Sequence, residues 1–248
     1  MTHLKPSGGR VALVTGGTGD LGRACVDSLL ARGIHVAVVD QRQPGDLDET
    51  ANARALWVMA DVTVPDQVVA AHEEVVERLG EVSILVNAAG IARSTRFADI
   101  SLAEWNNVLG VSITGTFLMT QACLPGMMAA GWGRVVNFSS TAGKNVSTLA
   151  GAHYTTAKAG ILGLTRALAK EFGPCGITVN SVCPGLFETE MARSLATHLD
   201  LGDYVTSLPV PRIGEPREVG DLVTFLASDG AAYITGASID INGGELMV

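Results

Sequence analysis

The sequence predicts one α/β domain over residues 1–248, doubly wound around a parallel sheet. Short β-branched runs alternate with amphipathic helical patterns, and no linker, repeat or charge run divides them. A glycine-rich turn joins the first strand to the first helix, and polar residues follow several strands. The 248 residues, 47% of them hydrophobic, suffice for a single core.

The first strand, residues 11–15, leads directly into the turn TGGTGDLG at 15–22, and a helical pattern follows as far as Ala31. Gly17, Gly19 and Gly22 match the spacing GxGxxG, in which backbone N–H groups at a helix N-terminus face a pyrophosphate. The turn residues expected to bind a dinucleotide are Gly16, Thr18, Gly19, Asp20, Leu21 and Gly22.

The second strand, residues 35–40, ends in Asp40. A carboxylate at this place accepts hydrogen bonds from the adenosine ribose and repels a 2′-phosphate. No Lys or Arg lies within 16–19, so we expect NAD(H) to be preferred over NADP(H). Arg42 is the residue able to reverse this preference, and an ordinary strand-end turn is the alternative role of Asp40.

The third strand at 55–60 and the fourth at 84–86 flank a charged amphipathic helix at about 66–79. The carboxyl ends of strands in an open parallel sheet form the ligand crevice. Further cofactor contacts are therefore expected from Asp61, Val62, Asn87, Ala88, Ala89 and Gly90.

Residues 105–133 contain no charged side chain, and the next charged residue is Arg134. Polar residues, Pro125 and glycines interrupt the stretch, so it is no continuous span of ~20 apolar residues. It is better explained as a helix buried against the sheet and against a second subunit. Together, this helix and the apolar face beside Tyr154 present more apolar surface than a soluble monomer exposes to water. A homotetramer is therefore expected.

The fifth strand, residues 135–138, delivers Ser140 to the crevice, and Tyr154 and Lys158 lie on one face of the next helix. Free tyrosine has a pKa near ~10, and a neighbouring cation lowers it. Tyr154 would then exchange a proton with an alcohol or carbonyl oxygen to which Ser140 hydrogen-bonds. The YxxxK spacing also occurs by chance in many helices, but the preceding dinucleotide turn favours catalysis.

The sixth strand, residues 178–182, ends in PGLFETEM at 184–191, and Pro184, Gly185, Phe187 and Thr189 are expected at the reactive ring of the cofactor. Residues 190–214 are expected to be an irregular, mobile lid over the substrate. A helix at 216–227 and a strand at 238–241 close the domain. By loop position, the expected substrate pocket comprises Ser94, Lys144, Asn145, Leu149, His153 and Phe187.

Composition excludes several function classes. A net charge of −8 without basic clusters argues against nucleic acid or an anionic membrane as a partner. Residues 1–10 have no apolar core, so they are expected to be a flexible terminus rather than a signal peptide, and the protein to be cytoplasmic. The four cysteines form no CxxC pair and have no regularly spaced His, so neither a metal site nor a disulfide is expected.

These motifs together resemble the short-chain dehydrogenase/reductase family of the ~250-residue type. TGGTGDLG is similar to its TGxxxGxG turn, LVNAAG to its NNAG-type strand end, and PGLFETEM to its PG-x-x-x-T turn, while the catalytic Ser-Tyr-Lys set is matched by Ser140, Tyr154 and Lys158. The tail FLASDGAAYITGASIDINGG also matches. The resemblance covers essentially the whole chain and implies a Rossmann-like fold with seven parallel strands and helices on both faces.

The resemblance also implies an NAD-dependent oxidoreductase that interconverts a secondary alcohol and a ketone, usually as a tetramer. Lys158 would bind the nicotinamide ribose, and Thr189 would hold the carboxamide. The chain departs from the family pattern at two residues. Asp20 replaces a glycine of the turn, and aspartate tolerates the left-handed region better than most residues. Ser112 replaces the asparagine that completes a catalytic tetrad and helps to hold a relay water.

Three other functions stay open. The family contains reductases of 3-oxoacyl thioesters, but these usually use NADPH, so Asp40 counts against that function. A non-catalytic NAD-binding scaffold or sensor is a second alternative, which the complete Ser-Tyr-Lys set disfavours. Sugar-nucleotide epimerases share YxxxK, but they carry a C-terminal substrate domain for which 248 residues leave no room.

Overall fold

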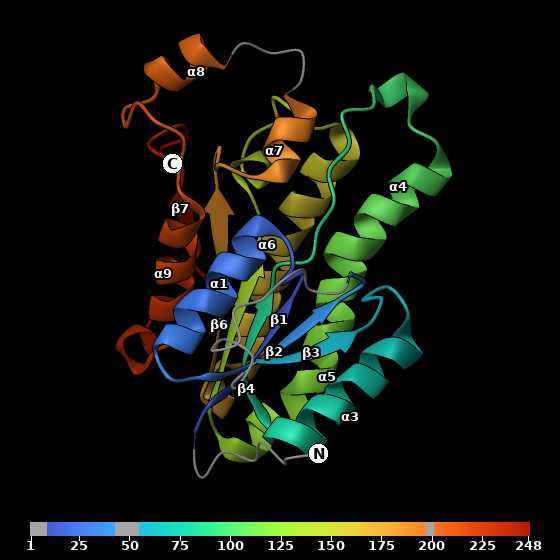
Figure 1. Ribbon diagram of the computed structural model, residues 1–248, viewed down its shortest axis with the longest axis vertical. Coiled ribbons are helices and arrows are strands. Elements are labelled where there is room, and N and C mark those ends of the chain that lie inside the picture. The colour runs from blue at the N-terminus through green and yellow to red at the C-terminus, as the bar shows by residue number, and fades with distance from the viewer. Residues whose placement is uncertain (1–8, 43–54, 197–200) are drawn as a thin grey trace.

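A parallel sheet in the order β3-β2-β1-β4-β5-β6-β7 runs through the middle of the molecule (Figure 1). The computed structural model describes residues 9–42, 55–196 and 201–248. Its strands are β1 Val11–Thr15, β2 His35–Asp40, β3 Ala55–Met59, β4 Val82–Asn87, β5 Gly133–Phe138, β6 Ile177–Pro184 and β7 Ser238–Ile241. The predicted seven-stranded, doubly wound parallel sheet is confirmed.

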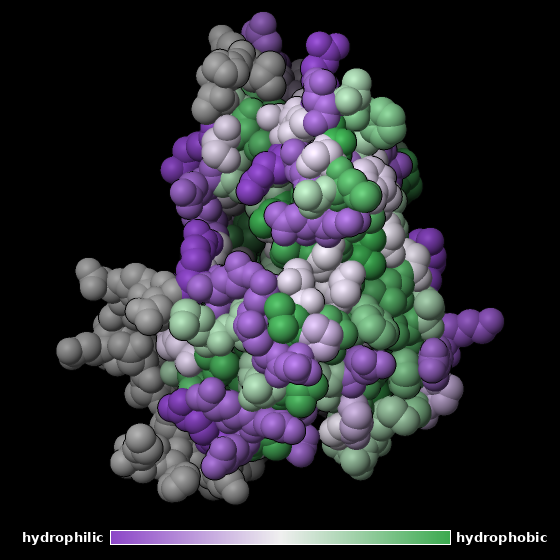
Figure 2. Space-filling model, turned by 90° about the vertical axis from the view of Figure 1, so that its right-hand side faces the viewer, coloured by the Kyte–Doolittle hydropathy of each residue, from purple (hydrophilic) through white to green (hydrophobic). Residues whose placement is uncertain are grey.

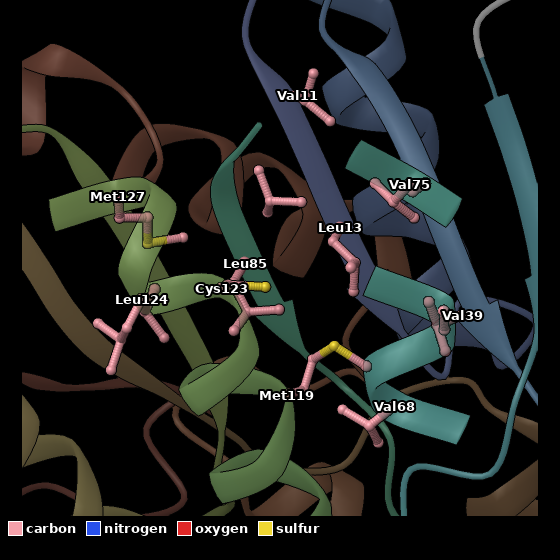
Figure 3. Close-up of a cluster of buried hydrophobic side chains, with 14 of the residues drawn as sticks. Val11, Leu13, Val39, Val68, Val75, Leu85, Met119, Cys123, Leu124 and Met127 are labelled. Carbon is pink, nitrogen blue, oxygen red and sulfur yellow. The ribbon is translucent and has the colours of Figure 1, made fainter. Parts of the chain in front are cut away.

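Helices cover both faces of the sheet, so the central strands are buried on both sides and consist of near-continuous apolar runs. On one face lie α1 (Asp20–Ala31) and α9 (Pro216–Leu226), packed against each other. On the other face lie α3 (Pro65–Leu79), α5 (Gly115–Ala130) and α6 (Ala152–Phe172). Within β1, Leu13 packs with Met119 and Val68 of the second layer (Figure 3), whereas Val14 packs with α1.

The uncharged stretch forms one helical run over Leu102–Ala130, in which a π-helical turn, Gly110–Thr114, joins α4 (Leu102–Leu109) to α5. By length and composition alone it is long enough to cross a membrane. Its inner side instead packs on the sheet, with Met119, Cys123 and Met127 buried. Figure 2, which turns the right-hand side of Figure 1 toward the viewer, shows hydrophobic residues interspersed with polar ones on this side.

The region after β6 is more regular than the sequence predicted. Within the expected lid, α7 (Glu190–Leu195) and α8 (Gly202–Ser207) are short helices. Thr189 Oγ1 accepts the Ala192 N–H and so caps α7. Residues 197–200 of that segment lie outside the described residues.

Most of the N-terminus predicted to be flexible, residues 1–8, also lies outside the described residues. Arg10, in contrast, is attached to the domain: its guanidinium donates to both carboxylate oxygens of Asp229, each at 2.7 Å. It also stacks 4.0 Å from the ring centroid of Trp132.

Candidate active site

A cavity of about 760 Å³ opens where the strands end. It extends from the glycine turn, past the ends of β2, β4 and β6, to the face of α6 that carries Tyr154. The structure places most of the predicted residues on its wall: Gly16, Gly19, Asp20, Leu21, Gly22, Asp40, Val62, Ala88, Ala89, Gly90, Leu149, Tyr154, Lys158, Pro184, Gly185, Phe187 and Thr189.

The glycine turn has no space for side chains at two positions. A Cβ on Gly16 would lie 2.7 Å from Ala89 Cα, and one on Gly22 would overlap the Gly16 carbonyl. Gly16 also has φ 67°, in the left-handed region. Asp20 differs from expectation, because it begins α1 and, among the described residues, only glycines have positive φ. The first residues of α1 line the cavity, and the N–H groups of a first helical turn have no intrahelical partners.

Asp40 ends β2 at the cavity wall, as predicted, and its carboxylate is already partnered. Oδ2 accepts from Thr18 N at 3.1 Å and Thr18 Oγ1 at 2.6 Å, while Oδ1 accepts from Arg42 N at 3.1 Å. Thr18 itself does not line the cavity. Its role in the structure is to fix the Asp40 carboxylate against the glycine turn.

Two other predicted cofactor contacts do not line the cavity. Asn87 is buried, and its Nδ2 donates to Asn137 Oδ1 at 2.9 Å and Thr120 Oγ1 at 3.1 Å, so it joins β4 to β5 and α5. Asp61 Oδ1 accepts from Thr63 N at 2.8 Å and Thr63 Oγ1 at 2.7 Å. Its carboxylate thus fixes the turn before α3 rather than a ligand.

Tyr154 and Lys158 line one side of the cavity, and Ser140 lies between the lining residues Ser139 and Thr141. The Ser140 hydroxyl, which follows β5, lies 3.5 Å from the Pro184 carbonyl oxygen and is near enough to the Tyr154 phenol to lower its pKa. Lys158 Nζ donates to the Phe138 carbonyl at 2.7 Å and lies 5.6 Å from the centroid of the Tyr154 ring. The Ala142 N–H donates to Ser140 Oγ at 3.1 Å and fixes the rotamer of the serine. The side chains predicted from spacing are therefore brought to one place.

Burial controls the electrostatics of this pair. It raises the pKa of Tyr154, and the hydrogen bond from Ser140 only partly opposes that rise. Burial also lowers the pKa of Lys158 to about 8, with the neighbouring Cys183 opposing it. The expectation that Lys158 lowers the pKa of Tyr154 is thus not what the structure shows, because desolvation is the larger effect. A protonated phenol suits proton donation to a carbonyl oxygen.

Ser112 lies in the π-helical turn, next to Lys158 across Gly90. A Cβ on Gly90 would lie 3.4 Å from Lys158 Nζ and 3.8 Å from Ser112 Oγ. The Ser112 hydroxyl is buried and has no hydrogen-bond partner among the described residues. Because buried hydroxyls are normally hydrogen-bonded, Ser112 offers a binding position for a water that continues a proton path from Lys158.

We expect Ser112→Asn to change turnover only a few-fold. One bridging water replaces, at little energetic cost, the contact that the longer asparagine side chain would make. Introducing the asparagine should therefore raise turnover only slightly. A substrate deuterated at the hydride position should show a primary isotope effect in the parent enzyme. A rise of ~10-fold or more in the variant, with little isotope effect in the parent, would instead show that the serine limits proton delivery.

Four of the six predicted substrate residues lie elsewhere. Ser94 and Asn145 are exposed and do not line the cavity, whereas Leu149 and Phe187 do. His153 is fully buried. Its Nε2 lies 2.8 Å from Glu104 Oε1, and its Nδ1 accepts from Tyr154 N at 2.9 Å, so the ring supports the start of α6.

Lys144 is the fourth misplaced residue and forms a clamp with β7. Its Nζ donates to Asp240 Oδ2 at 2.7 Å and to the Ser238 carbonyl at 2.8 Å. The pair is mostly shielded from solvent, and Lys144 directly follows the short turn that begins at Ser140. Lys144 therefore attaches the serine turn to the last strand instead of contacting substrate.

The sequence reasoning also missed part of the wall. Tyr204 of α8 and Glu245 near the C-terminus line the cavity and hydrogen-bond to each other. Burial raises the pKa of Tyr204, and the Glu245 carboxylate raises it further. Arg93, Met191 and Leu195 line it too. Glu245, the acidic residue after Gly243-Gly244, was the sequence feature that could have indicated this part of the wall. No local pattern shows that the C-terminal segment returns to the cavity.

The doubly wound sheet, the glycine turn and the Ser-Tyr-Lys set on one cavity define a dinucleotide-binding oxidoreductase. Comparison with known proteins agrees. A family model described as enoyl-(acyl carrier protein) reductase matches residues 18–245. The chain is 40% identical to the 3-oxoacyl-[acyl-carrier-protein] reductase FabG of Aquifex aeolicus, covering 95% of this chain and 97% of the relative.

Two further comparisons cover nearly the whole chain. Acetoacetyl-CoA reductase of Rhizobium meliloti is 42% identical over 95% of this chain and 98% of the relative. The crystal structure of levodione reductase aligns with a TM-score of 0.88 and 31% identity, over 95% of this chain and 97% of that one. The chain belongs to the short-chain dehydrogenase/reductase family, and the predicted resemblance is confirmed.

Proposed function

We propose that the protein interconverts a ketone and a secondary alcohol with a nicotinamide dinucleotide. The observation that carries this proposal is the pair of Tyr154 and Lys158 on the cavity wall, with Nζ of Lys158 5.6 Å from the Tyr154 ring centroid and Ser140 beside the phenol. A neutral phenol and a serine hydroxyl there are both able to donate to one substrate oxygen.

The proton chemistry follows from these side chains. In reduction, the Tyr154 hydroxyl gives its proton to the carbonyl oxygen as the carbon becomes a carbinol, and Ser140 orients that oxygen. Tyr154 is reprotonated from solvent along Lys158 and the Ser112 position. The bound dinucleotide supplies the hydride.

The cofactor site fits the dinucleotide NAD(H). Gly16 and Gly22 of the close-packed turn line the cavity where the pyrophosphate is proposed to bind, and Asp40 lines it at the proposed ribose end. Thr189, together with Leu186 and Phe187, borders the region proposed for the carboxamide. The Arg42 side chain is mostly exposed, and its Nε lies 4.0 Å from Asp40 Oδ1, so the carboxylate attracts the guanidinium only weakly.

We expect Asp40→Ala to narrow the preference of the enzyme for NAD(H) over NADP(H) by about 10-fold or more. The substitution removes the charge that repels a 2′-phosphate and releases Arg42 to bind it. Specificity constants for both cofactors, measured in parent and variant, test this. A parent that prefers NADP(H) would contradict the assignment.

A 3-oxoacyl thioester is the second candidate substrate, because two relatives are named as reductases of such compounds. Its 3-oxo group is itself a ketone, so the proposed chemistry is unchanged. A panel of simple ketones, secondary alcohols and acetoacetyl-CoA, followed at the nicotinamide absorbance, distinguishes the two. Binding of NAD(H) with no turnover of any member of the panel would favour a scaffold instead.

We propose a cytoplasmic homotetramer whose partner is a small alcohol or ketone, with neither nucleic acid nor membrane involved. On the outer side of α5, Phe117 is 45% and Met128 46% exposed, and Tyr233 near β7 is fully exposed. Burial of such side chains between copies is favourable. Light scattering should therefore give about four times the chain mass at micromolar concentration, and a stable monomer would refute the assembly.

A further inference from the structure

Asp20 connects the glycine turn to the helix that follows the Pro184-Gly185 turn. Its Oδ2 accepts the Glu190 backbone N–H at 2.7 Å, across 170 residues of sequence. Both residues line the cavity. The family pattern has a glycine at position 20, which has no side chain able to make this contact.

The contact acts on the start of α7. A helix leaves the N–H groups of its first turn without intrahelical partners. Here Thr189 Oγ1 takes the Ala192 N–H at 3.1 Å, and Asp20 takes the Glu190 N–H. The residue proposed to hold the carboxamide, Thr189, is thus fixed from both sides.

The same residue lines the cavity at the glycine turn, where the pyrophosphate of the cofactor is proposed to bind. Asp20 is the first residue of α1, so its charge faces the positive end of that helix, the end that also attracts a pyrophosphate. Like charges a few ångströms apart at a partly exposed site repel each other and are screened by salt.

We propose that Asp20 is a positioning residue that fixes α7 before the cofactor arrives and weakens cofactor binding by its charge. This inference rests on the proposed cofactor site. The same carboxylate thus has two effects: it weakens binding of the cofactor, and it fixes Thr189 in position before the cofactor binds. Release of NAD(H) is then faster than a glycine at position 20 would allow.

Two substitutions separate the two roles, and a third is a control. Asp20→Asn keeps an oxygen acceptor and removes the charge, whereas Asp20→Gly removes both. Asp27→Asn removes one exposed charge further along α1, from an ion pair with Arg23 at 2.8 Å. The Kd for NADH is measured by fluorescence at low and high salt, and amide exchange of residues 190–195 is measured without cofactor.

Asp20→Asn should bind NADH about 3- to 10-fold tighter at low salt, with the gain shrinking at high salt, and should keep the parent exchange of α7. Asp20→Gly should bind tighter too, but exchange the α7 amides about 5-fold or more faster. Asp27→Asn should change neither.

An unchanged Kd in Asp20→Asn, or unchanged α7 exchange in Asp20→Gly, would overturn the proposal. If the parent binds no NADH, the proposed function fails, whereas the exchange measurement still tests the contact itself.

Discussion

Tyr154→Phe is expected to lower turnover by at least ~10²-fold while the Kd for NADH changes little. Phenylalanine keeps the packing of the ring and removes the transferable proton. Steady-state rates with the best substrate of the panel, together with NADH fluorescence titration, measure both quantities.

Tyr233→Phe is the matched control, because Tyr233 is fully exposed and does not line the cavity. It should retain parent turnover. Near-normal turnover in Tyr154→Phe would show that another group moves the proton, and the Ser-Tyr-Lys assignment would then be wrong.

Lys158→Met is expected to lose activity on the same scale, at least ~10²-fold, and to gain stability. The pKa of Lys158 falls from 10.5 to about 8 on folding because the ammonium is buried. The folded state thus binds fewer protons than the unfolded state between these pH values. The free energy of unfolding therefore rises with pH through that window, and below it the buried charge destabilises the fold.

Replacing the lysine with a similarly shaped apolar side chain should raise the free energy of unfolding by about 1–3 kcal/mol at pH 7. The gain is reduced by loss of the Phe138 hydrogen bond, and it should shrink toward pH 10.5. Urea unfolding at both pH values measures it. Lys170→Met, an exposed position on the same helix, should give no gain. A less stable Lys158→Met would contradict the burial argument.

Local pattern was enough to predict the sheet and to predict that Tyr154 and Lys158 lie close to Ser140. All seven strands overlap predicted runs, and β1, β2 and β7 begin and end at the predicted residues. Tyr154 and Lys158 share a helix face because of their spacing alone. The Ser140 position follows from the end of β5.

The misplaced residues have specific physical reasons. β4 continues one residue beyond the predicted end, to Asn87, and side chains alternate along a strand, so Asn87 points into the layer of α5. The partner of Lys144 is Asp240, 96 residues away, and no local pattern reveals that ion pair. His153 is likewise satisfied by Glu104 from another helix.

The clamp between Lys144 and Asp240 also has a consequence for the order in which the protein matures. The serine turn is attached to β7, which follows the other strands of the described sheet in the sequence and pairs only with β6 within that sheet. A ribosome-bound chain that stops before Ser238 already contains Ser140, Tyr154 and Lys158, but not the strand that anchors the serine. Such a long-range contact forms late because its loop-closure entropy is large. The Lys144–Asp240 contact that fixes the serine turn therefore forms only after β7 has emerged.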